Sequence, residues 1–130
     1  MNKIVARYAD GNVLKGFTND FAPDRRMFHL ADRTDGSVHV VNVDRLKAVF
    51  IVKEFDGDPD YREASDFDPG KSAGYGSKLK VVFRDGEEFT GVATGYGPDR
   101  HGFFMTPCDP ECNTIRAFVV TDFVDHMEKL

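Results

Sequence analysis

The chain has 130 residues, 41% of them hydrophobic, and a formal net charge of −5 at pH 7. This length suffices for one ordinary domain or two very small ones. No apolar run approaches the roughly 20 residues of a membrane helix, and the first residues lack the apolar stretch of a signal peptide. We therefore expect a cytoplasmic protein that makes no membrane contact. The negative charge disfavours non-specific binding of nucleic acid, which depends on many phosphate contacts.

Residues 1–57 carry the pattern of five short strands. β-Branched and aromatic side chains predict the first strand over 4–9, and the pair Asp10-Gly11 that follows it is a strong hairpin signal. Gly16 lies in the second predicted strand, where a glycine typically marks a bulge, a sharp bend or a close backbone approach. The second to fifth strands are predicted over 12–21, 26–31, 37–43 and 47–53, with a 3₁₀ turn at 44–45.

An acidic linker that contains proline and glycine is predicted over residues 58–76. Asp58 and Pro59 are typical of the cap and the first position of a helix. We expect a short helical turn that runs to about Ala64. The linker separates two segments with the same pattern.

Residues 77–130 repeat the pattern of residues 1–57. Strands are predicted over 79–84, 87–96, 102–106, 114–120 and 124–130, with a turn at 121–122. An offset of 75 aligns residues 8–30 with residues 83–105 without a gap. The identical pairs include Asp10/Asp85, Gly11/Gly86, Gly16/Gly91, Pro23/Pro98, Asp24/Asp99, Arg25/Arg100 and Phe28/Phe103. Chance is a poor explanation for so many matches in register, so we interpret the chain as an internal duplication.

Beyond this segment we predict that the offset widens to 77. The wider offset pairs Val38, Val41, Val43 and Leu46 with Ile115, Phe118, Val120 and Phe123. A two-residue insertion accounts for the change. It falls in the loop PCDPECN, residues 107–113, which is rich in turn-forming residues and therefore tolerant of insertions.

Several stretches of the sequence resemble known families. The pattern aromatic-x-Asp-Gly-x-x-apolar-x-Gly, at residues 8–16 and 83–91, resembles the first motif of Sm-like proteins. The stretch VNVDRLKAVFIV, residues 41–52, is similar to the Sm-like fourth strand, short turn and fifth strand. Residues 45–63 are similar to a bacterial domain family with no established activity. The resemblance implies small barrels and raises RNA binding as one function.

The predicted fold is therefore all-β, with two tandem five-stranded SH3/Sm-like barrels over residues 1–57 and 77–130. Five short strands with one bend are typical of a small, partly open barrel. Because a unit of this size is marginally stable alone, we expect the two copies to pack against each other. Whether the chain also self-associates stays open, since edge strands can pair within or between chains.

The repeated Pro-Asp-Arg turn supplies the candidate binding residues. Arginine beside an aromatic ring suits stacked bases or phosphate groups. The same turn also has a purely structural interpretation, in which proline sets the turn, aspartate caps it and arginine pairs with a nearby carboxylate. The candidates in the two copies are Arg25, Arg26, Phe28, Arg100, His101 and Phe103.

No set of residues points to catalysis. Cys108 and Cys112 have a spacing that zinc permits, but no second pair of ligands follows, so we expect free thiols. We predict no catalytic residue, no metal and no cofactor. The expected function is a non-enzymatic binding or regulatory module for an unidentified protein partner, in a bacterial signalling setting. RNA binding through the Arg-aromatic turns is the alternative, which the net charge disfavours.

Overall fold

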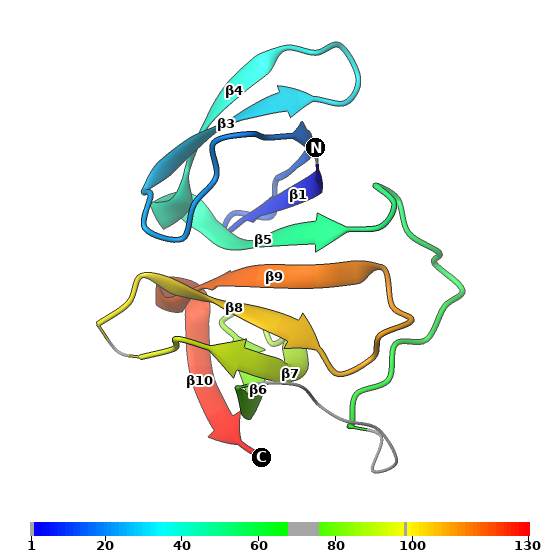
Figure 1. Cartoon of the computed structure of the whole chain (residues 1–130), viewed down its shortest axis with the longest axis vertical. Helices are drawn as coiled ribbons and strands as arrows, with labels where there is room; N and C mark the ends of the chain where they lie inside the picture. Colours follow the sequence, from blue (N-terminus) through cyan, green and yellow to red (C-terminus); the bar gives the residue numbers. More distant parts are fainter. Residues whose placement is uncertain (1, 68–75, 98) are drawn as a thin grey trace.

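The computed structural model describes residues 2–67, 76–97 and 99–130. All ten predicted strands are present, and they form one antiparallel sheet in the order β10-β6-β7-β8-β9-β5-β1-β2-β3-β4 (Figure 1). No helix among these residues is long and apolar enough to cross a membrane. The elements are β1 (Lys3–Tyr8), β2 (Val13–Phe17), β3 (Met27–Asp32), β4 (Val38–Asn42), η1 (Val43–Arg45), β5 (Leu46–Val52), β6 (Ser77–Phe83), β7 (Glu88–Thr94), β8 (Gly102–Pro107), β9 (Thr114–Val120), η2 (Thr121–Phe123) and β10 (Val124–Lys129).

The two halves have the same strand order. The first half runs β5-β1-β2-β3-β4 and the second runs β10-β6-β7-β8-β9. They join through antiparallel pairing of β5 with β9, which lie side by side across the middle of the molecule (Figure 1). The prediction of two barrels is wrong in one respect, because the ten strands form a single open sheet. Strands β5 and β9 pair with each other along their otherwise free edges. Strands β4 and β10 are therefore the outer edges of the sheet.

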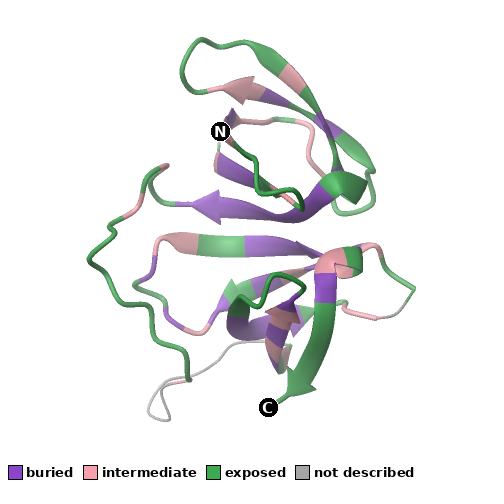
Figure 2. Cartoon of the chain, turned by 180° about the vertical axis from the view of Figure 1, so that it is seen from behind, coloured by how far each residue is buried: buried purple, intermediate pink, exposed green. Residues whose placement is uncertain are grey.

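Each half curves around its own apolar core, and each core takes residues from the other half. The first core comprises Ile4, Ala6, Phe28, Leu30, Val41, Val43, Leu46, Val49, Ile51, Phe118 and Val120. The second core comprises Val5, Ala48, Phe50, Val52, Leu79, Val81, Phe83, Phe89, Phe103, Met105, Ala117, Val119, Val124 and Ala93. Strand β5 is consequently buried along its whole length (Figure 2). Each half therefore contributes buried apolar side chains to the core of the other half.

The predicted offset of 77 is wrong by one residue. Phe28 pairs with Val41 in the first half, and Phe103, its equivalent, pairs with Val119 in the second. The equivalent of Val41 is therefore Val119, an offset of 78, and the loop insertion has three residues. In a strand a one-residue slip moves a side chain to the opposite face. Phe118 accordingly points away from its own core and into the first core.

The predicted helical turn in the linker is also wrong for the described residues, 58–67. Only one turn forms there, closed by the Tyr61 amide, which donates to the Asp58 carbonyl at 3.1 Å. The segment is held instead by Asp109, which accepts from the Tyr61 hydroxyl at 2.6 Å and from the Ala64 amide at 2.9 Å. The bond to Asp109 raises the pKa of Tyr61 to about 12. Residues 68–75 of the predicted linker lie outside the described residues.

Candidate functional site

The two Pro-Asp-Arg turns meet at one hollow on the surface. They are far apart in sequence, but they precede β3 and β8, which the shared sheet brings to the same side of the molecule. The hollow has a volume of about 370 Å³. Its lining residues are Pro23, Asp24, Arg26, Asp99, Arg100, His101 and Gly102. Three of the predicted site residues, Arg26, Arg100 and His101, therefore share one place.

The aromatic members of the predicted site are not available to a ligand. Phe28 lies in the first core and Phe103 in the second, and both are buried. Neither ring can stack on a base in this structure, because other side chains cover both faces. The prediction of Arg-aromatic turns that stack bases is thus not supported at Phe28 and Phe103.

The arginines of the first turn pair with neighbouring acceptors, as the structural interpretation expects. Arg26 donates to the Asp44 carboxylate at 2.8 Å, and Arg25 donates to the Asp20 carbonyl at 3.2 Å. Asp20 also accepts from the backbone and the ring of His29, at 2.9 and 2.6 Å. These bonds lower the pKa of Asp20 to about 2. In the second turn, His101 Nε2 is buried without a hydrogen-bond partner among the described residues.

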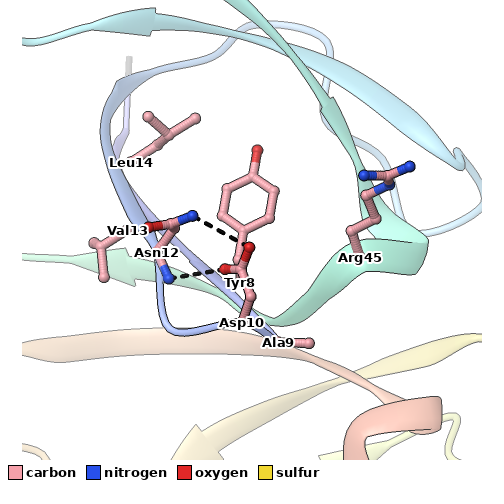
Figure 3. Close-up of a pocket in the computed structure, with 7 residues that line it drawn as sticks. All are labelled: Tyr8, Ala9, Asp10, Asn12, Val13, Leu14 and Arg45. Carbon is pink, nitrogen blue, oxygen red and sulfur yellow. Dashed lines mark hydrogen bonds between the residues drawn. The ribbon is translucent and has the colours of Figure 1, made fainter.

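A larger hollow of about 650 Å³ lies at the end of the first half, between the β1–β2 hairpin and η1 (Figure 3). The Tyr8 pocket, as we call it, was not predicted from the sequence. Its lining residues are Tyr8, Ala9, Asp10, Asn12, Val13, Leu14 and Arg45. Apolar walls with a few polar groups are typical of binding pockets in general.

Asp10 is held in place by the hairpin. It accepts from the Asn12 backbone amide at 2.9 Å and from the Asn12 side-chain amide at 3.2 Å. The Tyr8 ring packs at the margin of the first core, and burial, followed by the charge of Asp10, raises its pKa. Arg45 lowers that pKa to a lesser degree. Arg45 makes no ion pair within the described ranges.

The equivalent place in the second half is filled. Phe83, Asp85 and Glu87 stand where the first half has Tyr8, Asp10 and Asn12. Lys47, from β5 of the first half, places its ammonium group 4.7 Å from the centre of the Phe83 ring. The same nitrogen lies 2.7 Å from Asp85 and 2.8 Å from Glu87. The pKa of Asp85 is lowered, chiefly because its carboxylate accepts a hydrogen bond from Lys47.

The difference between the halves therefore lies in what covers the hairpin. In the second half the adjacent strand, β5, delivers a lysine onto an aromatic ring and two carboxylates. In the first half no strand of the described residues occupies the adjacent position, because β4 is an edge. The sequence shows the aromatic residue and Asp-Gly of both hairpins, but the role of Lys47 depends on β5 lying against β9.

The two cysteines lie in the loop between β8 and β9. Cys108 and Cys112 are free thiols, and burial raises the pKa of Cys112 to about 12. Across residues 2–67, 76–97 and 99–130, no three His, Cys, Asp or Glu side chains gather in a way that could hold a metal ion. A thiol with so high a pKa is mostly protonated near neutral pH, which makes it a poor nucleophile.

These features define an all-β protein in which two five-stranded units share one open sheet. The chain belongs to a family of unknown function, DUF6982, whose model matches residues 1–130. No curated protein and no solved structure shows a significant match to this chain.

Proposed function

We propose that the chain is a non-enzymatic protein-binding module whose partner adds a strand to β4. One observation carries the proposal: β4 is an open edge that exposes two apolar side chains, Val38 and Val40, on its outer face, beside the polar Asn42. Val38 is 67% exposed and Val40 61% exposed, and Met27 of the neighbouring β3 is exposed on the same outer face. An exposed edge strand is a template for pairing with another chain, and apolar side chains beside it add burial.

The other edge of the sheet differs in a way that supports this choice. The exposed residues of β10 are mostly charged or polar, namely Asp125, His126, Glu128 and Lys129. Charged side chains are a common means by which an edge strand avoids pairing. A protein that protects one edge and leaves the other apolar is suited to a partner at the apolar edge.

The likeness to Sm-like domains supports a binding role by analogy. Both halves have the strand order and the short 3₁₀ turn between the fourth and fifth strands that the resemblance implies. The matching halves also support the proposal that the chain arose by duplication of a unit of 50 to 55 residues. A shared fold does not establish a shared function, so the proposal depends on the β4 edge itself.

Val40→Lys should abolish capture of the partner, because a lysine at the centre of β4 would place a charge in the new interface. The measurement is quantitative affinity capture from a cell extract, with the wild-type chain and the variant compared at equal loading. Met127→Lys is the matched control, since it changes an exposed apolar residue on the other edge, β10. Proteins captured equally by all three forms would contradict the proposal, and so would catalytic turnover of a metabolite by the pure chain.

RNA binding is the second candidate, favoured by the convergence of Arg26, Arg100 and His101 on one hollow. The carboxylates of Asp24 and Asp99 in the same hollow oppose it. If it is correct, short single-stranded RNA should bind at low salt, and Arg26→Ala with Arg100→Ala should weaken binding about tenfold or more. The check is a fluorescence anisotropy titration at two salt concentrations. A chain that ignores RNA at low salt would end this candidate.

A further inference from the structure

The internal contact between β5 and β9 indicates which kind of strand the β4 edge accepts. By the offset of 78, β9 is the counterpart of β4, so β5 occupies on β9 the place that is vacant on β4. Val49 of β5 pairs with Phe118, and both side chains are buried. The counterpart of Phe118 is Val40, which is exposed. A strand that resembles β5 would therefore cover Val40.

The same comparison assigns a charge to the partner. Lys47 comes one residue before Ala48, which pairs with Val119, the counterpart of Val41. From this position Lys47 reaches Phe83 and Asp85. A strand paired to β4 in the same register would carry its equivalent residue to the Tyr8 pocket. There Tyr8 replaces Phe83 as the aromatic ring, and Asp10 replaces Asp85 as the carboxylate.

The chemistry of the pocket favours a cation there. The Tyr8 ring offers an aromatic face and Asp10 offers a carboxylate, which are the two contacts that Lys47 makes in the second half. Cation–π and ion-pair contacts of this kind each make a modest favourable contribution at partly exposed sites. Arg45, which lines the pocket from η1, opposes a cation by its charge. Asn12, in place of Glu87, makes the pocket less acidic than its counterpart.

A second copy of the chain does not fit this edge. Its free edge would be β10, where Asp125 is the counterpart of Lys47 and would meet Asp10, a like charge. His126 and Glu128 stand where β5 has the apolar Ala48 and Phe50. In this register His126 would lie opposite the buried Val41, where a polar ring is unfavourable, whereas Glu128 would lie opposite His39. The occupant is therefore a segment of another protein.

We propose that β4 binds, in antiparallel pairing, an extended segment of another protein in which a lysine or arginine precedes consecutive apolar residues. The basic side chain lies over Tyr8 against Asp10, and an apolar side chain covers Val40. This inference deepens the proposed function and rests on it. The inference specifies a basic side chain in the partner and the Tyr8 pocket as the place where that side chain binds.

The probe is a labelled peptide with the sequence RLKAVFIVK, residues 45–53 of the chain itself, carrying a flexible Gly-Ser tail. We expect it to bind the full-length protein in a fluorescence anisotropy titration. Asp10→Asn keeps an acceptor for the Asn12 amide but removes the charge, and should weaken binding about fivefold. The peptide with Lys47→Met should bind the wild-type chain about fivefold more weakly and be indifferent to Asp10→Asn, so that the two changes are coupled.

Asp35→Asn is the matched control, because Asp35 also precedes a glycine and accepts from the amide two residues on, but it lies at the other end of β4. It should leave the affinity unchanged. Arg45→Ala should strengthen binding, since it removes the opposing charge. If Val40→Lys abolishes peptide binding while Asp10→Asn and the methionine peptide change nothing, the strand-binding edge stands and the basic specificity is overturned.

Two further outcomes separate this inference from the function on which it rests. If no peptide binds but capture from the extract still depends on Val40, the protein-binding function stands and the partner chemistry proposed here is wrong. If light scattering shows self-association that Val40→Lys abolishes, the occupant is a second copy of the chain and the inference fails. If neither peptide nor extract responds to Val40→Lys, both proposals are overturned together.

Discussion

Replacing Phe118 with alanine should lower the free energy of unfolding by about 3–5 kcal/mol, as deletion of a fully buried aromatic side chain does. Phe118 is completely buried. Its ring lies 5.3 Å from the rings of both Phe21 and Phe104, measured between centres. It comes from β9 of the second half but packs into the first core. The cavity left by alanine would therefore lie at the contact between the halves.

The measurement is urea unfolding followed by circular dichroism, with Ile115→Ala as the control. Ile115 is on the same strand and is 47% exposed, so its truncation should change stability by less than about 1 kcal/mol. Because each core holds side chains from both halves, the wild-type chain should unfold in a single transition. Equal effects of the two substitutions would show that Phe118 does not join the halves as described.

The strands were predictable from sequence because their signals are local. Alternating β-branched residues and the repeated Asp-Gly pair mark β1 and β6, and the break at Asp44 marks η1. The strand predicted over 124–130 is confirmed as β10. In each case the information lies within a few residues of the element.

The features that sequence reasoning missed depend on contacts between distant segments. The pairing of β5 with β9 closes the gap between the halves and leaves the sheet open, and no local pattern specifies it. The error of one residue in the offset has the same origin. Phe118 and Val41 are both apolar, so they align well by type, yet they serve opposite faces because Phe118 is buried against the other half.

The candidate site also has some features that local sequence predicts and others that depend on contacts between distant segments. The Pro-Asp-Arg turns were found because they are repeated, but burial of Phe28 and Phe103 follows from their places in β3 and β8. The Tyr8 pocket was not predictable from the sequence, because it is defined by a difference in what covers the equivalent hairpin in each half. Its counterpart is covered by Lys47, which only the three-dimensional pairing brings near Asp85.

Gly16→Ala and Gly91→Ala should each destabilise the fold by about 3 kcal/mol, the upper end of the usual cost of overpacking, because the added methyl group has no room. Gly16 is in β2, and a Cβ there would collide with the backbone carbonyl of Ala31 and lie 2.7 Å from a methyl carbon of Leu30. Gly91 is in β7, where the collision is with the carbonyl of Thr106. Backbone atoms of a paired strand cannot move aside without breaking the sheet.

Gly97→Ala is the matched control for both changes. Among the described residues, no heavy atom outside its immediate chain neighbours would lie within 4 Å of a Cβ at that position. Its stability in urea should stay within about 0.5 kcal/mol of the wild-type value. Since Gly16 and Gly91 are equivalent under the offset of 75, similar losses at both would mean that the same close approach bends the second strand in each half. A loss at one position alone would mean that the two halves achieve their curvature differently.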